Sequence, residues 1–314
     1  MNFKQSIQTF MYYIVYALLY LLSLLPMRAL YILADGIYIL IYHIIGYRKR
    51  VVMSNLLIAF PEKTEAERIK IAKEFYLNFI DSFIEVIKLV SANDKFLQKR
   101  FDVNVDTINE LYKIGKACQL HLGHTFNWEW GQLVLRPLTP YKLMVVYMPI
   151  SNKIFDKIFY KLRTRSGSIF LPATDMKTAM LRHVDTQYLL GLVADQSPGK
   201  LTSAYWLNFF GRPTAFVSGP EKSARLIDLP VVFAYMEKPK RGHYRAVIEL
   251  ATDNASKMSE GELTMKYAHY LEDVIRRNPS MWLWSHRRWK HDWKEEYSAN
   301  WIDKEKLPEM SAKK

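Results

Sequence analysis

The chain begins with two long apolar stretches. Residues 10–26 contain no charged side chain in 17 positions, which is near the shortest length that spans a hydrocarbon core. Residues 30–46 are nearly as apolar but contain Asp35, and the basic run Arg48-Lys49-Arg50 follows. We predict a membrane anchor over residues 1–50, whose second stretch is a second crossing, a re-entrant segment or a helix in the interface. The basic run predicts that the rest of the chain faces the cytoplasm.

Two other interpretations of the first stretch are weaker. A cleaved signal peptide has a basic start and a small-residue exit, whereas one lysine precedes this stretch and Leu-Leu-Pro-Met-Arg ends it. A buried core helix does not need 17 consecutive uncharged residues. Both features favour an anchor.

Helix-start signals follow the anchor. Thr64 and Glu67 have the spacing of a capping box, and apolar residues then recur at three- and four-residue steps over 65–90. This pattern predicts a long amphipathic helix packed against protein. Ser259 and Glu262 repeat the capping-box spacing and predict a helix over 259–277, which Asn278-Pro279 ends.

Between these helices, short apolar runs alternate with helical stretches. We predict strands over 117–122, 143–147, 169–171, 188–194, 231–236 and 244–250. We predict helices over 126–136, 151–164, 175–184 and 218–227. The order is typical of an α/β fold with a mixed, largely parallel central sheet flanked by helices, and here an N-terminal membrane-anchoring helical segment precedes it.

The predicted elements also suggest how the chain is divided. After the anchor at 1–50, we expect one domain over 51–314. It consists of a helical lead-in over 51–100, an α/β core over 101–302 and a loose charged tail over 303–314. In such a core, ligands bind at the carboxyl ends of the strands.

The chain has an excess of positive charge. Lysine and arginine number 44 against 31 acidic residues, which gives a formal net charge of +13, while half of the residues are hydrophobic. A folded interior with a basic exterior predicts an acidic partner, which is nucleic acid, an anionic membrane surface or an acidic carrier protein. The anchor favours the membrane over nucleic acid. The single cysteine, Cys118, excludes an internal disulfide, and its apolar surroundings favour a packed, inert thiol.

Two H-x4-E pairs are the main clue to chemistry. They are His124 with Glu129 and His291 with Glu296, and with 8 histidines in 314 residues chance alone supplies about one such spacing. Five residues of helix turn through roughly 500°, so the two side chains meet only if the histidine precedes the helix. His124 meets this condition because it follows the predicted strand 117–122. A histidine oriented by a carboxylate takes the proton from an alcohol, which then attacks a thioester or ester.

Other chemistry has less support in the sequence. There is no G-x-S-x-G elbow, no H-E-x-x-H motif and no glycine-rich phosphate loop. His121 and His124 have a spacing that metal ligands use, but alternation along a strand favours a structural role for His121, and we predict no metal site. Asp195, like His124, lies just past a predicted strand end.

Five ordered blocks between residues 48 and 294 resemble the bacterial lipid A late acyltransferases. This family comprises lauroyl and myristoyl transferases within the wider H-x4-D/E glycerolipid acyltransferase group. The blocks are Asn55–Arg68, His124–Glu129, Ala194-Asp195-Gln196, Phe210-Gly211-Arg212-Pro213 and Met281–Arg288. One departure is Ser197, where many members have an acidic residue, so the resemblance does not carry the family's exact acceptor contacts over to this chain.

The resemblance implies an O-acyltransferase that needs no cofactor. It would move a fatty acyl group from an acyl carrier protein to a hydroxyl of a lipid A precursor, at the cytoplasmic face of the bacterial inner membrane. His124 would be the general base, and Glu129 would hold its tautomer. The same chemistry on a lysophospholipid or aminoacyl lipid, with an acyl carrier protein or coenzyme A donor, is an alternative. A non-catalytic membrane or nucleic-acid binding protein is a more remote one.

The resemblance also implies roles for six further residues. Arg165 would stabilise the tetrahedral oxyanion. Asp195 and Gln196 would orient the acceptor headgroup or brace the histidine. The remaining three, Arg212, Arg287 and Arg288, would meet phosphate or the membrane interface. Five of the eight tryptophans lie among basic residues between 282 and 301, a mixture that suits such an interface.

Overall fold

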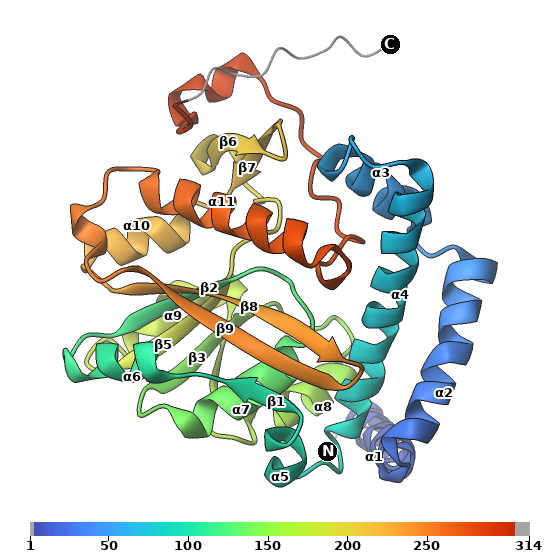
Figure 1. Cartoon of the computed structure of the whole chain (residues 1–314). Coiled ribbons are helices and arrows are strands. Elements are labelled where there is room, and N and C mark those ends of the chain that lie inside the picture. The colour runs from blue at the N-terminus through green and yellow to red at the C-terminus, as the bar shows by residue number, and fades with distance from the viewer. Residues whose placement is uncertain (1–2, 305–314) are drawn as a thin grey trace.

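Seven strands form one mixed sheet at the centre of the computed structural model, which describes residues 3–304 (Figure 1). Its strands are β1 (Phe101–Val103), β2 (Cys118–Leu122), β3 (Lys142–Tyr147), β4 (Ile169–Pro172), β5 (Tyr188–Val193), β8 (Val231–Lys240) and β9 (His243–Thr252). Their spatial order is β1-β9-β8-β2-β5-β3-β4, and among these described strands only the neighbours β8 and β9 run antiparallel. The predicted α/β fold with a largely parallel sheet is confirmed.

Helices cover both faces of the sheet. They are α6 (Asp106–Lys113), α7 (Trp128–Leu138), α8 (Lys153–Thr164), α9 (Met176–Leu181), α10 (Gly219–Leu226) and α11 (Glu262–Arg277). Figure 1 shows α10 and α11 on one face, with α6 and α7 on the other. Because both faces are covered, the central strands are buried on both sides, as parallel strands in such folds are. Leu189 of β5, for example, is fully buried.

The first hundred residues are helical. They comprise α1 (Phe3–Leu24), α2 (Met27–Tyr38), a π-helix over Ile39–Ile45, α3 (Lys49–Ala59), α4 (Glu65–Lys88) and α5 (Asp94–Gln98). The capping box of Thr64 and Glu67 at the start of α4 is confirmed. By length and composition, Ile7–Leu24 and Met27–Ile45 are each able to cross a membrane. Figure 1 shows α2 running beside α4.

Several elements differ from the sequence prediction. The short strand β1, the helix α6 and the antiparallel hairpin of β6 (Tyr205–Phe209) and β7 (Arg212–Phe216) were not predicted. Pro213 argues against a strand by pattern, and β1 has only three residues. Ser259 does bond Glu262, but α11 begins only at Glu262, with Gly261 in the left-handed conformation as its N-cap.

The predicted division of the chain keeps its order in the structure. The sheet begins at β1, just past the expected start of the α/β core, and the N-terminal helices precede it. Whether the anchor, lead-in and core are separate units stays a prediction. Most of the predicted charged tail, residues 305–314, lies outside the described residues.

Candidate functional site

The two chemical groups predicted at strand ends are brought together by the sheet. His124 lies two residues past β2, and Asp195 lies two residues past β5. These strands are parallel neighbours with Leu122 opposite Val193, so their carboxyl ends reach the same edge in register. The register therefore sets His124 opposite Asp195.

Asp195 is the carboxylate partner of His124. The imidazole Nδ1 donates to Asp195 Oδ1 over 2.5 Å, and the His124 backbone amide donates to Oδ2 over 2.7 Å. Trp282 Nε1 also donates to Oδ2, over 2.7 Å. Burial raises the pKa of Asp195, but the charge of His124 when it is protonated and these hydrogen bonds outweigh burial, and the net pKa lies below its ordinary value. Asp195 is thus a buried, ionised group that holds the ring.

Gln196 completes the surroundings of the histidine. Its Nε2 donates to His124 Nε2 over 3.1 Å. Because an amide nitrogen only donates, this contact selects the neutral imidazole that carries its proton on Nδ1 and a lone pair on Nε2. That tautomer is the one a general base requires.

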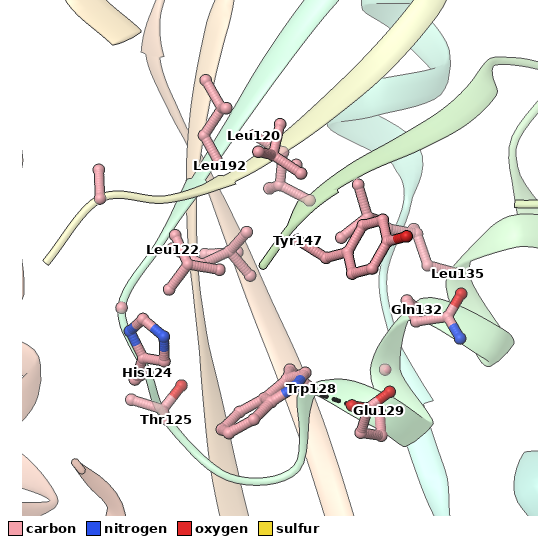
Figure 2. Close-up of a pocket in the computed structure, with 18 of the residues that line it drawn as sticks. Leu120, Leu122, His124, Thr125, Trp128, Glu129, Gln132, Leu135, Tyr147 and Leu192 are labelled. Atoms are coloured by element: carbon pink, nitrogen blue, oxygen red, sulfur yellow. Dashed lines mark hydrogen bonds between the residues drawn. The ribbon is translucent and has the colours of Figure 1, made fainter. Parts of the chain in front are cut away.

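Glu129 does not contact His124 in this way, which corrects the predicted pairing. Its carboxylate accepts from Arg163, over 3.1 Å from Nε and 2.5 Å from Nη2. Figure 2 shows the ring of Trp128 between His124 and Glu129. Trp128 packs edge-on to His124 and donates its Nε1 to Glu129 over 3.3 Å. The first turn of α7 therefore directs Glu129 towards α8, away from the histidine.

An apolar cavity of about 540 Å³ opens beside these residues. Leu120 and Leu122 of β2, Leu135 of α7, Tyr147 of β3 and Leu192 of β5 line it, as the close-up shows (Figure 2). His124, Glu129, Arg163 and Gln196 supply polar groups to the same lining. A largely apolar cavity with a few polar groups is what a ligand with a long hydrocarbon part requires.

The segment after α11 holds the histidine loop. Phe126 N donates to Met281 O over 3.2 Å, and Leu283 N donates to His124 O over 3.1 Å. Trp282 and Trp284 are almost completely buried here. The tryptophans at the start of this segment therefore pack against the site, which corrects the expectation that they meet a phosphate-rich interface.

Arg165 does not lie where an oxyanion donor is needed. Its Nη1 donates to the carbonyl of Leu89, and it is not part of the cavity lining. Arg163, which the sequence reasoning missed, lines the cavity instead. Side chains two positions apart on a helix are separated by roughly 200° around its axis, so Arg163 and Arg165 point in opposite directions. The helical phase of the predicted helix over 151–164 was the sequence signal that could have distinguished Arg163 from Arg165.

The remaining predicted arginines are scattered. Arg288 is 2% exposed, and its guanidinium stacks on Phe216, 4.2 Å from the ring centroid, so it does not meet a membrane. Burial lowers the pKa of Arg288 to about 10, against the opposing charge of Asp195. Arg212 pairs with Asp292 over 3.3 Å outside the cavity, and Arg287 is exposed.

Two buried groups on β2 serve packing. Cys118 is buried and burial raises the pKa of its thiol to about 12, as expected of an inert cysteine. His121 donates to Gln119 Oε1 over 2.8 Å, and burial lowers the pKa of His121 to about 3. Within residues 3–304, no three His, Cys, Asp or Glu side chains are grouped so that they could hold a metal ion.

Comparison with known proteins shows the family of this chain. Residues 1–291 match the family model described as bacterial lipid A biosynthesis acyltransferase. The lipid A biosynthesis palmitoleoyltransferase of Escherichia coli K12 is 22% identical over 245 residues, which cover 77% of this chain and 79% of that protein. The lipid A biosynthesis lauroyltransferase of the same strain is 23% identical over 275 residues, which cover 87% and 89%. The chain therefore belongs to the bacterial lipid A biosynthesis acyltransferase family and is an acyltransferase.

Proposed function

We propose that this chain transfers a fatty acyl group from an acyl carrier protein thioester to a hydroxyl of a lipid A precursor, at the cytoplasmic face of the inner membrane. The observation that carries the proposal is the His124–Asp195 pair beside an apolar cavity of about 540 Å³. The cavity suits a fatty acyl chain, and the pair suits proton removal from a hydroxyl. The relatives named above act in lipid A biosynthesis, which supports the choice of acceptor.

The reaction begins with proton removal. The acceptor hydroxyl replaces the Gln196 amide at His124 Nε2, and the imidazole takes its proton as the oxygen attacks the thioester carbonyl. Asp195 stabilises the imidazolium that forms, because its carboxylate already accepts from Nδ1. When the tetrahedral intermediate collapses, the C–S bond breaks and the carrier thiolate takes the proton from the imidazolium.

Arg163 is the positive group available for the developing negative charge. It lines the cavity, and Glu129 holds its guanidinium with two donors engaged. A preorganised cation near a developing oxyanion lowers the barrier because it need not reorient during the reaction. In this proposal Glu129 acts through Arg163, as a positioning residue.

The basic exterior supports the choice of donor. Acyl carrier proteins and lipid A phosphates are anionic, and a chain with a net charge of +13 attracts both. Binding that depends on this attraction weakens as salt rises.

The test is an assay of the purified protein in detergent with lauroyl-acyl carrier protein and a lipid A precursor. We expect the acceptor to gain one acyl chain, as measured by mass spectrometry. Lipid A from a strain that lacks the gene should correspondingly lose one chain. An unchanged acyl count in the strain, together with transfer to a lysophospholipid in vitro, would contradict the proposed acceptor.

The cavity has its own test at Gly191 of β5. A Cβ added there meets Met144 O at 3.5 Å and Val145 Cγ2 at 3.9 Å, which are ordinary contacts, and Gly191 lines the cavity. We expect Gly191→Leu to lower the rate with long-chain donors more than with short-chain donors, because the added side chain occupies the cavity. Gly191→Ala is the matched control and should change this preference little. An equal loss of rate for donors of all chain lengths would show that the acyl chain does not bind in this cavity.

A further inference from the structure

The two helices that are long enough to cross a membrane pack against the rest of the chain, chiefly against α4 and, for α1, also against α8. On α1, exposed apolar side chains cover a broad face that includes Phe10, Tyr13, Leu18 and Leu21. The other face packs against protein, and Tyr12 on it is 7% exposed. Such a helix has one side for lipid and one side for the domain.

The domain side of α1 meets charged groups of α8. Lys157 Nζ lies 4.5 Å from the ring centroid of Tyr12, and Lys161 Nζ lies 5.0 Å from that of Tyr16. Both tyrosines fall inside the candidate span Ile7–Leu24. If α1 crossed the membrane, these lysines would enter the hydrocarbon core, where charged side chains are strongly disfavoured.

The turn between α1 and α2 is bonded to the end of α4. Lys88 Nζ donates to the carbonyls of Ser23 and Leu25, over 2.7 and 3.0 Å. Ser91 Oγ donates to the Ser23 carbonyl over 2.8 Å. A turn on the far side of a bilayer would lie roughly 30 Å from the cytoplasmic surface. It could not then be bonded to a helix that enters the α/β domain.

The second candidate span is tied down in the same manner. Tyr31 donates to Glu85 of α4 over 2.8 Å, and Asp35 pairs with Arg241 over 2.7 Å. Just past the span, Arg48 Nη1 donates to the carbonyl of Ser285 over 3.0 Å. The first half of Met27–Ile45 and a residue just past its end are therefore bonded to charged or polar groups of the rest of the chain.

We propose that α1 and α2 do not cross the membrane but lie along the surface of one leaflet, with their exposed apolar faces among the lipid chains. Exposed basic side chains on α2, α3 and α8 suit anionic headgroups; they are Arg28, Lys49, Arg50, Lys153, Lys157 and Lys161. The occupant of the surface is thus the cytoplasmic leaflet itself. The α1–α2 turn and the α/β domain then share one side of the membrane. The inference rests on the membrane association in the proposed function and not on the reaction.

The test uses single-cysteine variants of the full chain with Cys118 replaced by alanine. Lys4→Cys reports on the start of α1, Arg28→Cys on the turn, and Glu62→Cys on the domain as the matched control. A membrane-impermeant maleimide is applied to spheroplasts and to inverted inner-membrane vesicles. We expect all three cysteines to react in inverted vesicles and none in spheroplasts.

Each other pattern overturns the inference in a recognisable way. Reaction of Arg28→Cys alone in spheroplasts means that both helices cross, and reaction of Lys4→Cys alone means a single crossing. If Arg28→Cys reacts only after detergent is added, the turn lies within the hydrocarbon core. If the protein is found in the soluble fraction after cell lysis in low-salt buffer, the proposed membrane association fails instead. Acyl transfer by the same vesicles reports separately on the reaction.

Discussion

The stretches His124–Glu129 and His291–Glu296 share one spacing but lie in different surroundings. His124 follows β2 and lines the cavity with Glu129, whereas neither His291 nor Glu296 belongs to that lining. The glutamates bond elsewhere in both stretches, Glu129 to Arg163 and Glu296 to Lys294. What distinguishes His124 is Asp195, which arrives from the neighbouring strand. A motif spacing therefore locates this histidine, but the sheet supplies its carboxylate.

The largest expected effect separates the two histidines. His124→Ala removes the proposed base, and we expect the rate of acyl transfer to fall by about 10²–10⁴-fold, the usual worth of a positioned base. His291→Ala is the matched control and should retain the rate. The measurement is the initial rate with an acyl carrier protein donor in detergent, with circular dichroism to confirm folding. Full activity of the His124→Ala variant would show that His124 is not the base, and neither H-x4-E stretch would then explain the reaction.

The next effect concerns the carboxylate from the other strand. Asp195→Asn keeps the size of the side chain but removes the charge that stabilises the imidazolium, so we expect kcat to fall by roughly 10²–10³-fold with KM little changed. Steady-state kinetics measures both constants. If Asp195→Asn stayed active while Glu129→Gln lost all activity, Glu129 would be the partner of His124 during the reaction, contrary to the observed contacts.

A smaller effect is expected for the pair that faces the cavity. Glu129→Gln and Arg163→Met should each slow transfer by roughly 10- to 100-fold, because a displaced charge stabilises the oxyanion less well. The two changes act on one unit, so the double variant should lose less than the product of the single losses. Multiplicative losses in this double-mutant cycle would show that the two side chains act independently.

The smallest effect is on stability, and it comes from the buried His121 beside this site. Its pKa is lowered by burial to about 3 from an ordinary value of 6.5, so the unfolded chain binds more protons between these pH values. The free energy of unfolding should therefore fall as pH drops below 6.5, by at most about 1.4 kcal/mol per pH unit from this group.

Thermal unfolding in detergent between pH 4.5 and 7.5 measures this slope. His121→Asn should flatten it, and the part that remains belongs to groups such as His286, whose pKa burial lowers to about 4. An unchanged slope in the His121 variant would assign the acid sensitivity to other groups. His291→Ala is again the comparison, since His291 is only partly buried.

Local pattern was sufficient wherever one element determines its own structure. The apolar run of β2 and the capping box of Thr64 depend on neighbours in the sequence, and both are found in the structure. Strands such as β1 and β7 were missed because three residues or a proline carry little periodic signal, and pairing with other strands stabilises them. The surroundings of α1 stayed open for a similar reason, since its contact with Lys157 comes from α8, far away in the sequence.

The sequence by itself determined the fold class, the family resemblance and the place of His124 at a strand end. Only the tertiary structure decided the partner of that histidine, because 71 residues separate it from Asp195 and parallel pairing of β2 with β5 brings the two together. The same limit applies to Arg163 and Arg165, which differ in helical phase rather than in chemistry. Composition and spacing are properties of neighbouring residues, whereas a hydrogen-bonded histidine–aspartate pair at the edge of a sheet depends on strand order and burial.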